Sequence, residues 1–138
     1  MIWFVMDTNV LVSGFLRSDT PPGILLNGLV NRSFDLVLDS RIFLEYGDVL
    51  ARPKFRLTPA VTGPVLALIN AKGKWISPIG FDGILSDEGD RPFVEVALAA
   101  GVPLITGNLK HFASVPSSLL VLSPAQALEA MREQKRGE

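Results

Sequence analysis

Residues 2–9 of the chain read IWFVMDTN, and this stretch decides the fold. Its first five residues are apolar, which is typical of a strand buried on both faces of a parallel sheet. Asp7, Thr8 and Asn9 follow the strand directly, and residues 10–16 predict the first turns of a helix. Ligands of open parallel sheets bind outside the carboxyl ends of the strands, so these three polar residues are candidates for a functional site.

The rest of the chain alternates predicted helices and strands outward from this stretch. We expect further strands at residues 34–38, 75–78, 102–106 and 119–122. We expect further helices at residues 21–29, 41–52, 59–72, 90–100 and 124–131. Asp39 or Ser40 should cap the helix at 41–52, and Gly101 should end the helix at 90–100. Strands separated by helices imply parallel pairing with right-handed crossovers, which indicates an α/β fold.

The length of 138 residues fits one domain, which we place at residues 1–131, followed by a charged tail at residues 132–138 that should fray. Hydrophobic residues make up 48% of the chain and charged residues 20%, so most of it should fold around a core. The formal net charge of −1 excludes a global basic field of the kind that drives nonspecific nucleic-acid binding. Any contact with nucleic acid must come from local basic patches, which weakens a simple binding protein more than an enzyme.

The chain has no cysteine, which excludes disulfides and thiolate metal sites and fits a reducing compartment. The apolar run at the N-terminus ends at Asp7 and lacks the basic start of a signal peptide. The longest other apolar stretch, residues 94–105, contains Glu95 and Pro103, which argues against a membrane span. We therefore expect a cytoplasmic protein without a membrane segment.

A second acidic candidate lies on the helix expected at residues 41–52. Glu45 shares one face of this helix with Ile42, Tyr46 and Val49, and this apolar face should point at the core. An unpaired charge on a core-facing side is costly, and metal coordination or an ion pair would relieve that cost. Glu45 is therefore a candidate metal ligand.

Two more candidates lie at the ends of predicted elements. Asp90 begins the helix at residues 90–100, where its carboxylate can point at the same sheet edge as that of Asp7. Asn108 follows closely after the strand at residues 102–106. Carboxylates that cluster without histidine or cysteine suit Mg²⁺ or Mn²⁺ rather than zinc. Such an ion can activate a water and neutralise charge on a phosphate, so the pattern favours chemistry on a phosphate.

Each candidate also has a purely structural interpretation. Asp7 and Asp90 could be helix N-caps. Glu45 could pair with Arg41 or Arg91. Four polar residues could be turn residues only; these are Thr8, Asn9, Thr106 and Asn108. Five more could be ordinary structural or solvated residues; these are His111, Lys110, Arg52, Lys54 and Arg56. The combination of positions, rather than any one residue, favours a site.

Four segments, in order along the chain, resemble the motifs of the PIN domain family. Residues 1–16 look like the opening strand and helix of that family, and residues 40–50 resemble its second acidic motif. Residues 87–95 (DEGDRPFVE) resemble the third motif, and residues 104–112 (LITGNLKHF) resemble the fourth. The resemblance runs from the first residue to about residue 127, which is nearly the whole chain.

The resemblance implies a three-layer sandwich around a five-stranded parallel sheet with strand order 3-2-1-4-5. It also implies a Mg²⁺- or Mn²⁺-dependent endoribonuclease that acts on single-stranded RNA and leaves a 5′-phosphate. Many prokaryotic members of the family are toxins of toxin–antitoxin pairs, held inactive by a partner protein, and many are homodimers. The toxin subgroup is the one that this chain resembles.

The resemblance implies a role for each candidate. The catalytic residues are Asp7, Glu45 and Asp90. They hold one divalent ion, Asn108 assists them, and the ion activates a water that attacks an RNA phosphodiester. Three polar residues would orient the carboxylates or touch the phosphate; these are Thr8, Asn9 and Thr106. Five basic residues would contact the RNA backbone; these are Arg91, Lys110, Arg52, Lys54 and Arg56.

Asn108 is the position where the chain departs from the family pattern, because many relatives carry an aspartate there. A neutral amide brings no charge, and Asp87 or Glu95 could compensate. The departure supports one alternative, a catalytically inactive PIN-fold module that binds RNA or protein. A phosphatase of another α/β family is a second alternative, but it would have an aspartate where this chain has Asn9. A third is an interaction protein whose acids form structural ion pairs.

Overall fold

The protein is built on a parallel, five-stranded sheet with strand order β3-β2-β1-β4-β5. The structure is a computed structural model that describes residues 1–78 and 80–137. The strands are β1 (Trp3–Met6), β2 (Asp35–Leu38), β3 (Lys74–Trp75), β4 (Leu104–Ile105) and β5 (Val121–Leu122). The strand order that the resemblance implied is therefore confirmed.

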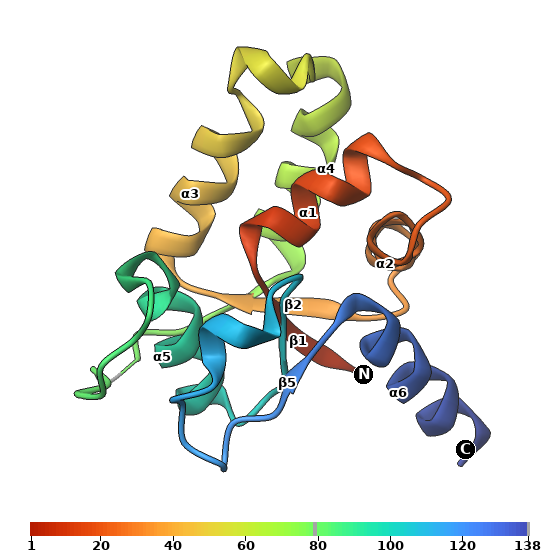
Figure 1. Cartoon of the computed structure of the whole chain (residues 1–138). Helices are drawn as coiled ribbons and strands as arrows, with labels where there is room; N and C mark the ends of the chain where they lie inside the picture. The colour runs from red at the N-terminus through yellow and green to blue at the C-terminus, as the bar shows by residue number, and fades with distance from the viewer. Residues whose placement is uncertain (79, 138) are drawn as a thin grey trace.

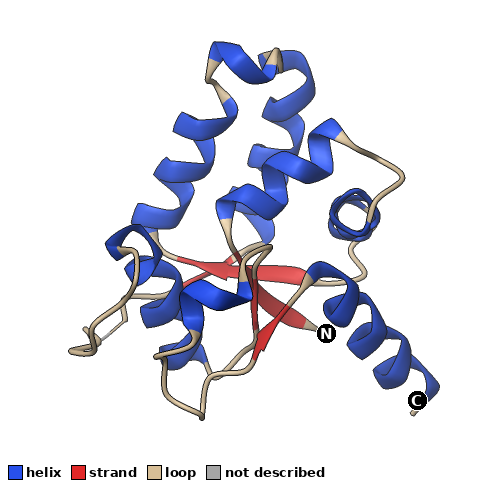
Figure 2. Ribbon diagram, viewed as in Figure 1, coloured by secondary structure: helices blue, strands red, loops and turns tan. Residues whose placement is uncertain are grey.

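Helices cover both faces of the sheet, as Figure 2 shows. The α-helices are α1 (Thr8–Leu16), α2 (Pro21–Val30), α3 (Ser40–Leu50), α4 (Pro59–Lys72), α5 (Arg91–Ala100) and α6 (Pro124–Arg136). Short 3-10 helices are η1 (Pro53–Phe55), η2 (Glu88–Asp90) and η3 (Leu109–Phe112). In Figure 1, α1, α3 and α4 lie on one side of the sheet and α5 lies on the other, which is the expected three-layer α/β sandwich. Across the described residues, no helix has the length and apolar character that a membrane span requires.

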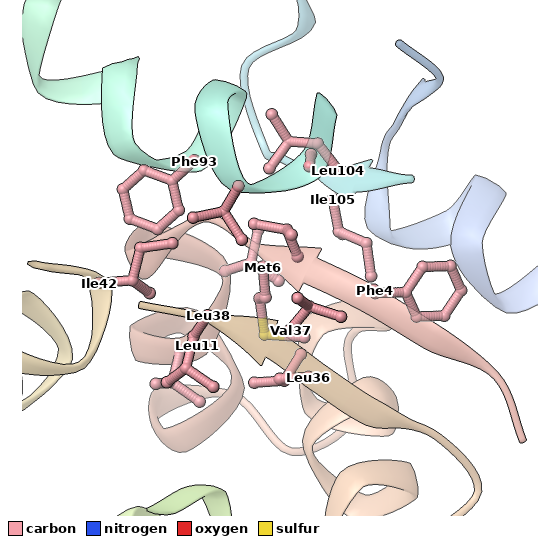
Figure 3. Packing of buried hydrophobic residues seen from close by; sticks show 14 of the residues in the cluster. Phe4, Met6, Leu11, Leu36, Val37, Leu38, Ile42, Phe93, Leu104 and Ile105 are labelled. Carbon is pink, nitrogen blue, oxygen red and sulfur yellow. The ribbon is translucent and has the colours of Figure 1, made fainter. Parts of the chain in front are cut away.

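The core is centred on β1 and β2, where Val5 and Leu38 are completely buried. Phe93 of α5 lies against one face of these strands, and Leu11 of α1 lies on the opposite side (Figure 3). Strands covered on both faces have no solvated side, which explains why they are apolar almost throughout. The apolar run at the start of the chain is therefore a central strand, as its composition predicted.

The pairing of β1 with β4 brings two polar segments together. Met6 pairs with Ile105 in parallel register, and the backbone N–H of Asp7 donates to the carbonyl of Ile105 over 2.9 Å. Asp7 and Thr106 therefore leave the sheet side by side, at the carboxyl edge where ligands of such sheets bind.

Two predicted helix ends are confirmed. The carboxylate of Asp39 accepts a hydrogen bond of 3.0 Å from the backbone N–H of Ile42, and so caps α3. Gly101 ends α5 with a φ of 67°, a left-handed conformation that glycine adopts without steric cost.

The predicted position of the third strand is wrong. We expected residues 75–78, but β3 consists of Lys74 and Trp75, both exposed at the sheet edge. These two residues pair with Val37 and Leu38, the last residues of β2, so the ladder ends where its partner strand ends.

The predicted end of the last helix is also wrong, because α6 continues past residue 131 to Arg136. Ser123 and Gln126 form a capping box that satisfies backbone donors at its first turn, and the residues that follow are mostly good helix formers. Most of the expected tail is thus helical, and Glu138 lies outside the described residues.

Candidate metal centre

Asp7 lies at the carboxyl end of β1 with its side chain half-buried. The hydroxyl of Thr106 donates a hydrogen bond of 2.9 Å to Asp7 Oδ2. Asp7 occupies the N-cap position of α1, as the structural interpretation expected, but its side chain is held by Thr106 rather than by a capping bond. Burial raises the pKa of the Asp7 carboxyl, the bond from Thr106 lowers it, and the charge of Glu45 raises it again, with a net rise.

Glu45 is carried to the same place by α3. Its carboxylate is half-buried and accepts a hydrogen bond from the hydroxyl of Thr8. The neighbouring Tyr46 donates from its hydroxyl to the carbonyl of Met6 over 2.6 Å, which fixes α3 against the end of β1. The helix-face argument predicted a core-facing Glu45, and the structure places its carboxylate half-buried and close enough to Asp7 for its charge to raise the pKa of Asp7.

The two arginines that could have paired with Glu45 have other partners. Arg41 Nη1 lies 2.8 Å from Glu95 Oε1, and Arg91 Nε lies 2.6 Å from Glu88 Oε2. Within the described part of the chain, Glu45 forms no ion pair with either of them. Its charge therefore stays available to a cation.

Asp90, at the start of α5, is the most constrained acid of the site. Asp90 is only 7% exposed, and its Oδ2 atom has no hydrogen-bond partner among the described residues. Burial, followed by the charges of Asp7 and Asp87, raises the pKa of this carboxyl to about 6 despite the nearby His111. Asp90 makes no side-chain capping bond to α5, so helix capping does not explain the burial.

Other buried acids of the protein have arginine partners, and the contrast with Asp90 is informative. Asp35 lies 2.7 Å from Arg32, and Glu95 lies 2.8 Å from Arg41. A buried carboxylate without such a partner costs free energy, which a bound cation would relieve. Asp90 Oδ2 has no arginine partner and accepts no hydrogen bond among the described residues; His111 Nδ1 lies 3.4 Å from it. This environment fits a divalent cation at this edge of the sheet.

A further group of ligand-type side chains surrounds Asp90. Ligand atoms of Asp87, Asp90 and His111 all lie within 4.8 Å of one another. Among the described residues, Asp7 and Glu45 do not belong to this group. The charge of Asp7 nevertheless raises the pKa of Asp90, and the charge of Glu45 raises the pKa of Asp7. The sequence favoured a structural role for His111. Its position one turn after Asn108, beyond the end of β4, was the feature that could have indicated a place in the site.

Asn108 and Asn9 lie at the exposed rim of the site. The backbone N–H of Asn108 donates to the hydroxyl of Thr106 over 3.1 Å. Asp7, Asn9 and Asn108 line a cavity of about 270 Å³, and Asp7 is the one carboxylate among its described lining residues. Both amides are thus close to Asp7, and their roles toward metal or phosphate stay predictions.

The basic candidates lie at different distances from the acids. The guanidinium of Arg91 donates to the carbonyls of Phe81 and Gly83 and to Glu88, so it holds the loop before η2. Lys110 is exposed on η3, next to the site. Three residues lie on η1 or at its two ends, beyond the far end of α3 and away from the sheet in Figure 1; these are Arg52, Lys54 and Arg56.

The fold and the site define an α/β protein with an acidic centre at the carboxyl edge of a parallel sheet. A sequence profile of the PIN domain matches residues 4–110, and the chain belongs to this family. Membership supports a nuclease and a divalent metal, in agreement with the acidic cluster around Asp90.

Solved structures with the same fold include two complexes with DNA. One chain comes from VapBC2 of Rickettsia felis bound to a fragment of its promoter DNA, with 18% identity and a TM-score of 0.57, covering 89% of this chain and 98% of that one. Another comes from FitAB bound to an IR36 DNA fragment, with 16% identity and a TM-score of 0.59, covering 88% of this chain and 94% of that one. At these identities the likeness shows the fold. No curated protein matches the chain.

Proposed function

We propose that this protein is a divalent-metal-dependent endoribonuclease that hydrolyses phosphodiester bonds of single-stranded RNA. The observation that carries the proposal is the buried Oδ2 of Asp90, which accepts no hydrogen bond among the described residues. The charge of Asp7 raises the pKa of Asp90, and the charge of Glu45 raises the pKa of Asp7, so the three carboxylates are coupled in sequence. Buried negative charges that lie close together destabilise a folded protein unless a cation or a hydrogen bond compensates them. Family membership supports the same reading.

The ion in this proposal is Mg²⁺ or Mn²⁺, held by three carboxylates and one amide; these are Asp7, Glu45, Asp90 and Asn108. Oxygen donors are the ligands that such ions prefer. When bound, a divalent cation supplies an acidified water and neutralises charge that develops on the phosphate.

The side chains around the carboxylates have positioning roles in this proposal. Thr106 holds Asp7 and Thr8 holds Glu45, each through a hydroxyl donor. Carboxylates fixed in this way keep one orientation while they bind a cation or accept a proton from water. Asn9 and Asn108, at the rim of the cavity, can donate to the oxygens of a phosphate.

The net charge of −1 provides no global positive field that would attract RNA, so contacts with RNA would come from individual basic residues near the centre. Lys110 is the basic candidate on η3, adjacent to His111, and would contact the backbone near the scissile bond. Arg91 is engaged with its own loop, so its contribution would come through that loop. The basic residues around η1 would contact a more distant part of the strand.

We further propose that the protein is the toxin of a toxin–antitoxin pair in the cytoplasm, and that it forms a homodimer. The support is the sequence resemblance to that subgroup and the likeness to chains from VapBC2 and FitAB, which were solved as complexes on DNA. A small protein partner would then hold the nuclease inactive.

Substrate class is tested with end-labelled single-stranded RNA, a matched RNA duplex and single-stranded DNA of the same sequence. The proposal expects cleavage of the single-stranded RNA, dependence on Mg²⁺ or Mn²⁺, and products with 5′-phosphates. Equal cleavage of DNA, or products with 3′-phosphates, would contradict it.

One alternative has an observation in its favour. Asn108 is neutral and exposed where many relatives have an acid, which suits an inactive PIN-fold module that binds RNA or protein. This alternative expects RNA binding that survives Asp7→Asn and no turnover in any metal. Measuring RNA binding and RNA cleavage on the same samples distinguishes the ribonuclease from the inactive binding module.

A further inference from the structure

We propose that Asp87 and His111 complete a second cation subsite that shares Asp90 with the carboxylate centre and prefers a first-row transition-metal dication, such as Mn²⁺, over Mg²⁺. The inference rests on the proposed function, because it assigns a particular ion chemistry to the same edge of the sheet. It also gives a role to the single histidine of the chain.

The geometry of the three side chains suits a shared ion. Their ligand atoms lie within 4.8 Å of one another, and His111 Nδ1 lies 3.4 Å from Asp90 Oδ2. Nitrogen and oxygen ligands at about 2.0–2.2 Å from a transition metal are separated from each other by roughly 3–4.4 Å. Small side-chain rotations are therefore enough to bring all three into coordination.

Asp90 provides the independent sign that a ligand is expected here. Its Oδ2 atom is inaccessible to solvent, has no hydrogen-bond partner among the described residues, and faces the ring of His111. Buried polar atoms almost always have a partner. A cation on Oδ2, bound at the same time by the imidazole, satisfies that atom.

The segments that carry the subsite are held together. Asp87 Oδ1 accepts the N–H of Gly89 over 2.8 Å, which orients the carboxylate and leaves its second oxygen for a ligand. The hydroxyl of Ser114 donates to the carbonyl of Ile84 over 3.1 Å and so ties the segment after η3 to the loop before η2. Asp87 and His111 therefore approach each other from two connected segments.

Ligand chemistry sets the preference for the ion. Mg²⁺ favours oxygen ligands and keeps several waters, whereas imidazole favours transition metals. The carboxylate of Asp87 also supplies the charge that Asn108 does not bring. Glu95, the other sequence candidate for that role, is bound by Arg41 and by the backbone N–H of Phe81 over 2.8 Å, so it is not available.

The competing explanation is a protonated His111 that forms an ion pair with Asp90 and binds no metal. Pulsed electron paramagnetic resonance of bound Mn²⁺ separates the two, because a directly coordinated imidazole nitrogen gives a characteristic ¹⁴N coupling. With one histidine in an untagged chain, any such coupling belongs to His111. We expect the coupling in the native protein and its loss in His111→Ala.

Mn²⁺ titration of the native protein, Asp87→Asn and the matched loop control Asp82→Asn gives the second measurement. We expect Asp87→Asn to weaken Mn²⁺ binding by about tenfold or more, because removing even a side chain that only orients a ligand has an effect of this size. Asp82→Asn, which removes an exposed carboxylate from the same loop, should change the affinity little. Native protein that binds no Mn²⁺, or binds it without the nitrogen coupling, would overturn the subsite.

RNA cleavage is measured on the same samples, so that failure of the proposed subsite can be distinguished from failure of the proposed ribonuclease activity. Metal-dependent cleavage without nitrogen coupling overturns the subsite and leaves the ribonuclease standing. Nitrogen coupling without cleavage supports the subsite and overturns the ribonuclease.

Discussion

Thr106 Oγ1 donates a hydrogen bond of 2.9 Å to Asp7 Oδ2, and the two residues are 99 positions apart in the sequence. The same hydroxyl accepts the backbone N–H of Asn108, which leaves its proton directed at the carboxylate. Because Thr106 is completely buried, this contact holds Asp7 in one orientation. The ends of β1 and β4 are thus joined through the catalytic candidate.

Removing this donor should impair cleavage more than folding. In Thr106→Val the shape of the side chain is kept, but the carboxylate of Asp7 loses its fixed partner. We expect kcat for RNA cleavage to fall by roughly 10–100-fold, the usual effect of removing a side chain that orients a metal-binding carboxylate. Thr106→Ser keeps a hydroxyl and should retain most of the activity. Full activity in the valine variant would show that the hydrogen bond has no positioning role.

Glu45 and Asp48 offer a matched pair of substitutions on one helix. Glu45 lies in the site, whereas Asp48 is exposed and only 4.0 Å from Arg52. We expect Glu45→Gln to lower cleavage by about 100-fold or more, the size of effect seen when one polar group of a catalytic centre is removed. Asp48→Asn removes the same charge from α3 and should leave cleavage unchanged. Equal effects of the two variants would point to net charge rather than to the site.

The raised pKa of Asp90 makes the metal-free protein less stable at neutral pH. The folded-state pKa of about 6 lies above the ordinary value of 3.8, so the folded state binds the proton more tightly than the unfolded state. The resulting stabilisation is complete below the ordinary value and is lost as the pH rises through about 6. With metal chelated, the protein should melt higher at pH 5 than at pH 7.5.

Asp90→Asn removes this titration. We expect the variant to melt roughly 3–6 °C higher than the native protein at pH 7.5 with EDTA, which corresponds to a gain of about 1–2 kcal/mol. The difference should shrink at pH 5, and calorimetry at both pH values measures it. A lower melting temperature at pH 7.5 would mean that the Asp90 carboxylate stabilises the metal-free fold.

Glu95 has the opposite dependence on pH. Burial raises the pKa of its carboxyl. Hydrogen bonds from the N–H of Phe81 and from Arg41 together lower the pKa by more than burial raises it, so the net change is a decrease. The pair with Arg41 therefore stabilises the fold above the ordinary value of 4.5 and loses its effect as the pH falls through the lower folded-state pKa. Urea unfolding at a series of pH values should show the free energy of unfolding decreasing over this pH range.

Glu95→Gln should lower the free energy of unfolding at pH 7 by about 1–3 kcal/mol, less than for a fully buried pair because Arg41 is partly exposed. Glu129→Gln, which breaks an exposed pair with Arg132, should cost less than about 1 kcal/mol. Similar values for both variants would contradict a structural role for Glu95.

Lys110 is predicted to contact an RNA phosphate. Binding of single-stranded RNA is measured in an Asp7→Asn background, so that cleavage does not interfere. Lys110→Ala should weaken binding for all sequences and reduce the slope of log affinity against log salt by about 0.7, the value for one phosphate contact on a single strand. Lys135→Ala, near the opposite edge of the sheet, is the control. An unchanged slope in Lys110→Ala would place the RNA path elsewhere.

Sequence patterns predicted the elements that depend on local periodicity. The apolar run before Asp7 and the apolar face of the helix that carries Glu45 both follow from side-chain spacing. The structure forms β1 from the run and buries Ile42, Tyr46 and Val49 of that face. The short strands were harder, because β3 ends where β2 stops offering partners rather than at a local signal. The end of α6 was missed because its last residues, from Arg132 to Arg136, are mostly charged, a composition that the sequence interpretation took for a frayed tail.

Contacts between distant segments could not be predicted in the same way. Arg41 and Glu95 are 54 positions apart, and no periodicity indicates that they pair. His111 reaches Asp90 because η3 turns the chain back toward the start of α5, a geometry that the sequence after β4 does not specify. Resemblance supplied the strand order and the acidic centre; the structure added the partners of each acid.

The central claim is that the carboxylates around Asp7 and Asp90 form a metal-dependent nuclease centre. The most direct test is cleavage of single-stranded RNA in Mn²⁺, in Mg²⁺ and in EDTA, by native protein and by Asp7→Asn. We predict cleavage by the native protein in at least one metal, none in EDTA, and none by the variant. Cleavage that persists in EDTA or in Asp7→Asn, or folded native protein that cuts no RNA in either metal, would contradict the claim.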